Sequence, residues 1–162
     1  MNVSTAIATV FGAGYLRPAP GTWGSLAALP LAWGVAQWAG FFGLVFIGLI
    51  CFFAGIWATA EYTKALDNHD PSEVVIDELV GQWIALAPVI YGANAMNADL
   101  LALWPGWIAA FVLFRLFDIT KLGPIGWADR RNDPLGVMLD DVIAGVFAAI
   151  CVLVLAGLAH GL

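Results

Sequence analysis

The sequence VIDELVGQW (residues 75–83) places two adjacent acids where a polar stretch of the chain becomes apolar. A matching arrangement, VMLDDVIAG (residues 137–145), recurs near the other end of the chain. In each case two apolar residues follow the acids, and a glycine lies about one helical turn further on. Small residues at such positions allow close helix packing in membranes. The two stretches therefore predict helices that bring their carboxylates together at a membrane surface.

The composition indicates an integral membrane protein. Of the 162 residues, 62% are hydrophobic and only 11% are charged, whereas a soluble domain carries about 25% charged residues. Mean hydropathy is +0.89. A single membrane-embedded domain, residues 1–162, is the simplest organisation. The net charge of −6 and the absence of a basic stripe argue against a nucleic-acid partner.

Apolar segments of two lengths predict how the chain sits in the bilayer. Three are long enough to cross a hydrocarbon core of about 30 Å, and two are shorter. If all five cross, every Lys and Arg falls on one face, which the positive-inside rule makes cytoplasmic. We therefore expect an all-α, polytopic helical membrane protein with about five membrane-embedded segments and its polar motifs on the cytoplasmic face. The long segments are 41–60, 100–117 and 142–159, and the short ones are 26–38 and 79–91.

The two acid pairs form a candidate metal site. In the five-segment arrangement both pairs open helices that leave the cytoplasm in the same direction, so four carboxylates meet at one depth. They would repel one another unless a divalent cation neutralised them, and hard oxygen ligands favour Mg²⁺, Ca²⁺ or Mn²⁺. The alternative is that the acids only complement helix dipoles. Two matched pairs favour the metal site. Its candidate ligands are Asp77, Glu78, Asp140 and Asp141.

A charged stripe at the end of segment 100–117 is a candidate phosphate site. Arg115, Asp118 and Lys121 are spaced three residues apart, so a helix places them on one face. Asp118 is a candidate metal ligand or general base, and the two cations suit a phosphate group. An internal ladder of salt bridges explains the same spacing, and these residues alone do not decide between the two interpretations.

The segment RPAPGTWGS (residues 17–25) is dense in proline and glycine and predicts a turn, after which segment 26–38 begins. The turn resembles an anion-binding nest that leads into a helix. On these residues alone, a turn with Ser25 as helix N-cap is the simpler interpretation. The polar stretch 119–139 is likewise predicted to be a loop.

Five motifs, taken in order along the chain, resemble those of the phosphatidylglycerophosphatase A family. They are PGTWGS (20–25), DELVG (77–81), FRLFDITK (114–121), Asp129-Arg130 and GVMLDDVIAG (136–145). The resemblance implies a Mg²⁺-dependent lipid phosphatase of the bacterial inner membrane, with its active site on the cytoplasmic side. Its substrate would be phosphatidylglycerol phosphate, and its products phosphatidylglycerol and inorganic phosphate. One departure is Leu122-Gly123-Pro124, where the family often has Lys-Pro directly.

The resemblance and the residues together assign candidate roles. Mg²⁺ would be held by the four acids of the two pairs. The candidate catalytic residues are Asp118, Asp77 and Asp141, with Asp118 preferred for orienting or deprotonating water. The candidate substrate-binding residues are Arg115, Lys121, Gly21, Thr22, Gly24 and Ser25. A covalent aspartyl-phosphate route, a homo-oligomer and the number of metal ions stay open.

The alternative class of protein is a small ion- or proton-coupled transporter, or a structural membrane subunit. Acids that serve transport usually lie near the middle of the membrane and face the bundle interior. Here they lie at segment ends on one side, which favours surface chemistry on a lipid substrate.

Overall fold

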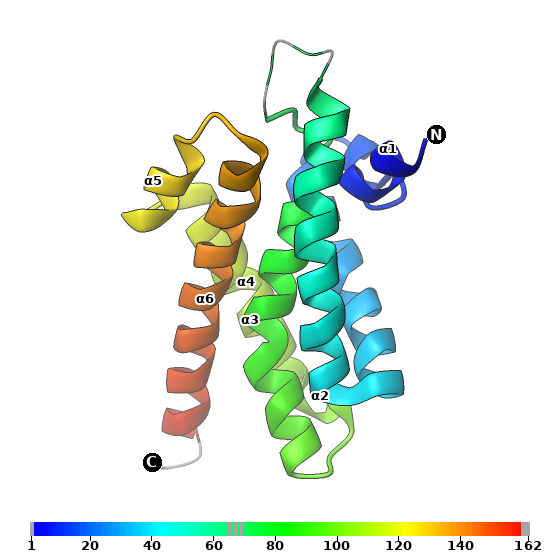
Figure 1. The fold of residues 1–162 in the computed structure, drawn as a ribbon. Coiled ribbons are helices and arrows are strands. Elements are labelled where there is room, and N and C mark those ends of the chain that lie inside the picture. Colours follow the sequence, from blue (N-terminus) through cyan, green and yellow to red (C-terminus); the bar gives the residue numbers. More distant parts are fainter. Residues whose placement is uncertain (1, 65, 67, 69, 160–162) are drawn as a thin grey trace.

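The computed structural model describes residues 2–64, 66, 68 and 70–159, and all the regular secondary structure within these ranges is helical (Figure 1). The all-α expectation is confirmed. The elements are α1 (Val3–Ala8), η1 (Ala13–Tyr15), α2 (Pro20–Thr63), α3 (Ile76–Ala95), η2 (Leu100–Leu103), α4 (Trp104–Thr120), α5 (Pro124–Asp129) and α6 (Pro134–Ala159).

Helix α2 consists of two arms that fold back on each other at Gly40. This glycine has φ 64° and ψ −164°, a conformation outside the helical region that residues with a Cβ rarely adopt. Figure 1 shows the two arms side by side, joined by a tight turn. The turn is tied to the end of α3, because the Asn94 side-chain oxygen accepts a hydrogen bond from the Phe41 N–H at 2.7 Å. The two predicted segments 26–38 and 41–60 are therefore the two arms of α2.

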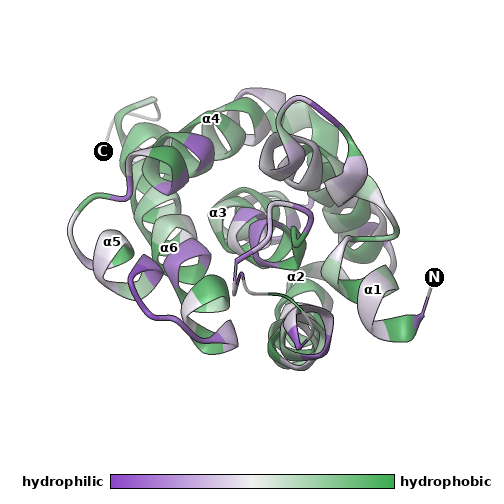
Figure 2. Ribbon diagram, turned by 90° about the horizontal axis from the view of Figure 1, so that it is seen from above, coloured by the Kyte–Doolittle hydropathy of each residue, from purple (hydrophilic) through white to green (hydrophobic). Residues whose placement is uncertain are grey.

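Helix α3 is the centre of the bundle. It packs most extensively against α2 and α6 and also contacts α4. Figure 2, seen along the bundle, shows α3 surrounded by the other long helices, with hydrophilic residues of α3, α4 and α6 at the near end. Small residues let the helices approach closely, as at Ala28, Ala32 and Ala36 of α2, which are almost completely buried.

Three stretches among the described residues are long and apolar enough to cross a membrane. These are Pro20–Thr63, Leu100–Thr120 and Pro134–Ala159. Large apolar side chains such as Phe42, Phe46 and Leu153 are exposed along their outer faces, as lipid-facing residues are. Helix α3 has 20 residues but carries two acids in its first turn and is the most enclosed of the long helices.

The predicted turn 17–25 is wrong in its second half, because α2 begins at Pro20. Proline is tolerated at the first position of a helix, where its missing N–H costs nothing. Ser25 is therefore not an N-cap. It lies within the second turn, fully buried, and its hydroxyl donates to the Gly21 carbonyl at 2.9 Å.

The predicted loop 119–139 is also partly wrong, because it contains α5 and the first turns of α6. Helix α6 begins at Pro134, and the Asp133 carboxylate accepts a hydrogen bond from the Gly136 N–H at 2.7 Å. Asp140 and Asp141 therefore lie in the second turn of α6 and do not open the helix. Asp77 and Glu78, in contrast, occupy the first turn of α3 as expected.

Candidate functional site

A polar cavity of about 330 Å³ lies at the end of the bundle where α2 and α3 begin and α4 ends. Its walls come from four helices and from the segment that precedes α3. The lining residues are Ala19, Pro20, Gly21, Asp70, Ser72, Val74, Asp77, Glu78, Arg115, Asp118, Lys121, Asp140 and Asp141. The cavity thus brings together residues from all the sequence motifs except Asp129-Arg130.

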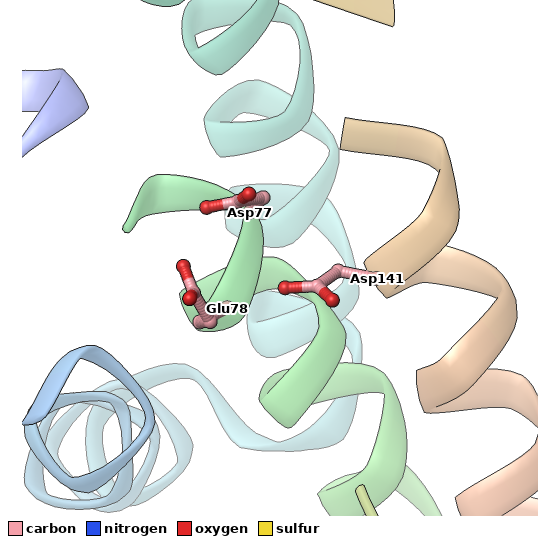
Figure 3. A group of neighbouring side chains, drawn as sticks. All are labelled: Asp77, Glu78 and Asp141. Atoms are coloured by element: carbon pink, nitrogen blue, oxygen red, sulfur yellow. The ribbon is translucent and has the colours of Figure 1, made fainter. Parts of the chain in front are cut away.

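Three of the four predicted metal ligands form a tight group. One carboxylate oxygen from each of Asp77, Glu78 and Asp141 lies within 4.8 Å of the other two. Figure 3 shows the three side chains directed toward one another, two from the start of α3 and one from α6. Asp77 is 7% exposed and Asp141 is 2% exposed, so solvent provides little screening of their charges.

Each member of this group has an oxygen without a partner. Within the described part of the chain, Asp77 Oδ1, Glu78 Oε2 and Asp141 Oδ1 are buried and lack a hydrogen-bond partner. A buried carboxylate oxygen that nothing satisfies is costly unless it is neutralised or coordinates a metal. The three oxygens are therefore a fitting donor set for a hard divalent cation such as Mg²⁺.

Asp140 occupies a different place from the other three acids. One of its oxygens forms a short ion pair with the Lys121 ammonium, and the other accepts the Asp141 N–H at 2.9 Å. Its side chain lies at the edge of the group and is already neutralised by a lysine. The sequence therefore predicted four equivalent ligands, whereas the structure brings together three and pairs the fourth with Lys121.

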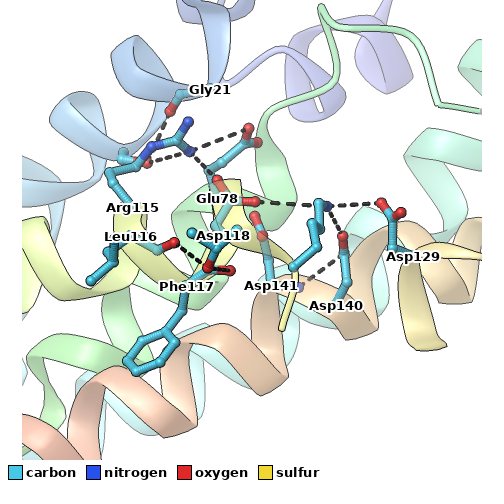
Figure 4. Close-up of polar contacts among 12 residues, drawn as sticks. Gly21, Glu78, Arg115, Leu116, Phe117, Asp118, Asp129, Asp140 and Asp141 are labelled. Carbon is cyan, nitrogen blue, oxygen red and sulfur yellow. Dashed lines mark hydrogen bonds and ion pairs between the residues drawn. The ribbon is translucent and has the colours of Figure 1, made fainter. Parts of the chain in front are cut away.

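The charged stripe of α4 forms an ion-pair network beside the acids (Figure 4). The Arg115 guanidinium lies 2.6 Å from Asp118 Oδ2 and 3.9 Å from Glu78 Oε1, and it donates to the Ser25 hydroxyl at 3.4 Å. Arg115 Nε is buried without a hydrogen-bond partner among the described residues. The ladder of ion pairs is present, and its members also line the cavity; the phosphate-binding role of the stripe stays a prediction.

Lys121 is the C-cap of α4 and is held by three carboxylates. In addition to Asp140, its ammonium lies 2.9 Å from Asp129 and 3.7 Å from Asp118. Burial alone would lower the pKa of Lys121, but the contacts with Asp140 and Asp129 outweigh burial and hold its pKa above the usual value. Lys121 is therefore a permanent positive charge at neutral pH.

The predicted glycine-rich residues contribute to the site unequally. Gly21 lines the cavity, and a Cβ atom there would lie 2.2 Å from Glu78 Oε1. Gly24 faces Val75, Ser25 meets Arg115, and Thr22 is half-buried outside the cavity lining. What the sequence described as a nest is therefore the N-terminus of α2, whose first N–H groups favour anions.

Part of the cavity wall was not predicted from the sequence. Asp70, Ser72 and Val74 line the cavity, and they belong to the segment that delivers the first acid pair to α3. That segment is held from the N-terminal side of the chain, because the Val75 N–H donates to the Ala8 carbonyl at 2.8 Å. Proximity to Asp77 along the sequence was the one available indication of this role.

The electrostatics of the cavity match a cation and a phosphate together. Its lining carries six carboxylates against two basic side chains, a formal charge of −4 when all are ionised. Such an excess is unfavourable in a partly buried site without counter-ions. A divalent cation would lower the charge, and the two basic groups can then bind an anionic ligand. The acid pairs lie in the first turn of α3 and the second turn of α6, whereas acids that serve transport usually lie near the middle of the membrane.

Comparison with known proteins identifies the family of the chain. The phosphatidylglycerophosphatase A family matches residues 6–156. The chain belongs to this family. A phosphatidylglycerophosphatase A of Haemophilus influenzae is 35% identical over 153 residues, which cover 94% of this chain and 88% of the relative. One of Escherichia coli is 37% identical over 147 residues, covering 88% and 77%.

A third relative carries a different name. A putative phosphatidylinositol-3-phosphatase of Bacteroides thetaiotaomicron is 40% identical over 160 residues, covering 91% of this chain and 90% of the relative. No solved structure matches the chain. As a phosphatidylglycerophosphatase A family member the chain is a lipid phosphatase, and the expected family resemblance is confirmed.

Proposed function

We propose that this family member hydrolyses the phosphomonoester of phosphatidylglycerol phosphate in a Mg²⁺-dependent reaction, giving phosphatidylglycerol and inorganic phosphate. Two relatives named for this substrate support the reaction. The observation that carries the metal dependence is the group of Asp77, Glu78 and Asp141, with three buried oxygens that have no hydrogen-bond partner. The location of the site at the end of apolar helices suits a phosphate on a lipid headgroup.

In this proposal the metal ligands are Asp77, Glu78 and Asp141, and Asp140 completes the set when its pairing with Lys121 loosens. Bound Mg²⁺ would supply charge neutralisation and polarise the phosphorus–oxygen bonds of the substrate. Binding of the phosphate and orientation of the attacking water would be carried out by side chains of this protein.

Arg115 and Lys121 would bind the nonreacting phosphate oxygens. The buried guanidinium of Arg115 has an unpartnered Nε, and its orientation is fixed by Asp118 at 2.6 Å. A planar guanidinium can contact two phosphate oxygens at once, whereas an ammonium acts as a point charge. The N–H groups at the start of α2, beside Gly21, carry the partial positive charge of a helix N-terminus and would also attract the phosphate.

Asp118 remains our first choice for orienting or deprotonating the attacking water. Its carboxylate lines the cavity and is 11% exposed, between Arg115 and Lys121. Asp77 and Asp141 are the other catalytic candidates. Because Asp118 is held between Arg115 and Lys121, its position suits a group that orients the attacking water.

We further propose that the chain crosses the bacterial inner membrane five times, with the cavity on the cytoplasmic side. The two arms of α2 together with α3, α4 and α6 would be the crossings. Five of the six Lys and Arg residues lie just outside these helices: Arg17 before α2, Lys64 after it, and Lys121, Arg130 and Arg131 between α4 and α6. The sixth, Arg115, lies near the end of α4 and lines the cavity. This distribution is what the positive-inside rule requires of a cytoplasmic face. Reporter fusions after Gly40 and after Met96 should report the periplasm, and fusions after Thr63 and Leu122 the cytoplasm.

Phosphate release by detergent-purified protein tests the function. Phosphatidylglycerol phosphate with Mg²⁺ should give phosphate, and excess chelator should stop it. The Asp140→Asn, Asp141→Asn double variant should fold normally and release no phosphate, whereas Asp99→Asn, a cap of η2 at the other end, should keep activity. A phosphatidylinositol 3-phosphate substrate must be included because of the Bacteroides relative. Faster hydrolysis of that lipid, or release that chelator does not affect, would contradict the proposal.

A further inference from the structure

Asp129 lies outside the cavity lining but touches a residue of that lining, Lys121. Its carboxylate lies 2.9 Å from the Lys121 ammonium. The other two partners of Lys121, Asp118 and Asp140, both line the cavity. The two acids that line the cavity are the more buried partners, since the side chains of Asp118 and Asp140 are 11% and 7% exposed. The side chain of Asp129 is 38% exposed. The Lys121 ammonium is therefore attracted toward the cavity by Asp118 and Asp140 and toward the protein surface by Asp129.

The fold is built so that Asp129 reaches this position. Lys121 and Gly123 have φ 49° and φ 56°, left-handed conformations that turn the chain sharply after α4. Helix α5 packs against α6, and its first turn lies on the Lys121 backbone, since a Cβ atom on Gly126 would lie 2.6 Å from the Lys121 carbonyl oxygen. Asp129 is the last residue of α5. The short helix thus brings Asp129 back to Lys121, which lies only eight residues earlier in the chain.

We propose that Asp129 is a positioning residue that holds the Lys121 ammonium at the outer edge of the cavity, where the ammonium can meet the substrate phosphate. This inference rests on the proposed function. Asp129 itself would touch neither the substrate nor a metal ion. It would act by keeping Lys121 from moving fully onto Asp118 and Asp140.

Loss of the outward attraction has two consequences. The ammonium would move toward Asp140, so the phosphate would lose a cationic partner and bind more weakly. Asp140 would be neutralised more completely, so the cavity would attract a divalent cation less strongly. Both effects act on binding. The Michaelis constant and the Mg²⁺ concentration for half-maximal activity should therefore rise, while kcat should change little.

The matched variants are Asp129→Asn and Asp133→Asn. Asp133 lies in the same connection, is similarly exposed and pairs with Arg131 at 2.7 Å instead of with Lys121. We expect Asp129→Asn to raise the Michaelis constant about 3- to 10-fold, with Asp129→Glu restoring part of the loss, and Asp133→Asn to leave it unchanged. Equal effects of the two Asn variants would indicate a general effect of surface charge and overturn the proposal.

A double-mutant cycle separates action through Lys121 from an independent role. If Asp129 acts through Lys121, then Lys121→Gln and the Lys121→Gln, Asp129→Asn double variant should have the same kcat/KM within about twofold. Effects of the two substitutions that multiply would overturn the proposal, because Asp129 would then contribute without the lysine.

A spectroscopic measurement tests the position of the ammonium without turnover. The chain has two lysines, Lys64 and Lys121, so reductive ¹³C-methylation gives NMR signals from these two side chains and from the amino terminus. Asp129→Asn should shift the Lys121 signal and leave that of Lys64, which pairs with Glu61, in place. An unchanged Lys121 signal would overturn the proposal. If the wild-type protein released no phosphate from any lipid, the proposed function would fail while this measurement still decided where Asp129 holds Lys121.

Discussion

The carbonyl oxygen of Gly81 lies only 2.4 Å from the point that a Cβ atom on Gly145 would occupy. The reverse contact is nearly as close, since a Cβ atom on Gly81 would lie 2.6 Å from the Asp141 carbonyl oxygen. Helices α3 and α6 therefore cross backbone to backbone, one turn inside the acids. This crossing brings Asp141 within metal-binding distance of Asp77 and Glu78.

The crossing predicts that Gly145→Ala is destabilising. The new methyl group would meet main-chain atoms of α3, which cannot move aside as a flexible side chain can, so the two helices must separate. We expect a loss of about 1–3 kcal/mol, measured by thermal unfolding in detergent, together with reduced activity. Gly92→Ala in α3 is the control. It has open space around it and should be neutral or slightly stabilising. Equal melting temperatures for the two variants would contradict the close crossing.

Gly21→Ala should impair the site more than the fold. A Cβ atom at Gly21 would lie 2.2 Å from Glu78 Oε1 and 3.1 Å from an Arg115 nitrogen, so both side chains would be displaced. We expect about a tenfold or greater fall in kcat/KM and a higher Mg²⁺ requirement, with little change in melting temperature. Gly34→Ala, on the same arm of α2 and without neighbours within 4 Å, should behave as the wild-type protein does.

Asp141→Asn should separate stability from activity. The substitution removes one charge from a buried group of acids, so without metal the protein should be equally or more stable. Phosphate release should fall by at least about 100-fold, because a ligand is lost from the centre of the group. Thermal shift titration with Mg²⁺ provides the third measurement. The wild-type melting temperature should rise with Mg²⁺ and that of Asp141→Asn much less. An equal rise in both would place the cation elsewhere.

The start of α6 should respond to pH through Asp133. The hydrogen bond from Arg131, followed by that from the Gly136 N–H, holds the pKa of Asp133 below its usual value. A carboxyl group with a lowered pKa stabilises the fold above its unfolded pKa of about 3.9, and this stabilisation is lost as pH falls through the lowered value. Asp133→Asn should therefore melt earlier than the wild-type protein at pH 7, and the difference should shrink toward pH 3. A difference that stays constant with pH would exclude an ionised cap.

Sequence patterns that reflect membrane length and helical spacing predicted most of the architecture. Apolar length located the five long helical arms, and the glycines after each acid pair predicted the crossing of α3 and α6. The spacing of Arg115 and Asp118 gave their ion pair directly, because residues three apart share a helix face. These features depend on segment length and on residue spacing within one helix, and both can be read directly from the sequence.

The parts that the sequence did not predict depend on tertiary contacts. Helix α5 has six residues and no apolar periodicity, and it is stabilised by packing against α6. The start of α6 was hidden in a polar stretch, although Asp133 before Pro134 is a reasonable helix N-terminus. The pairing of Asp140 with Lys121 could not be read from spacing, because it joins residues from two helices.

The site draws its charged groups from both halves of the chain, since Asp77 and Glu78 stand in α3, Arg115 in α4, and Asp140 and Asp141 in α6. During synthesis the last helix enters the membrane only after the others have left the ribosome. Until then the acids of α3 lack the neighbouring carboxylate of Asp141, so the proposed cation site is incomplete. Under the proposed function, a nascent chain would therefore be inactive until α6 docks.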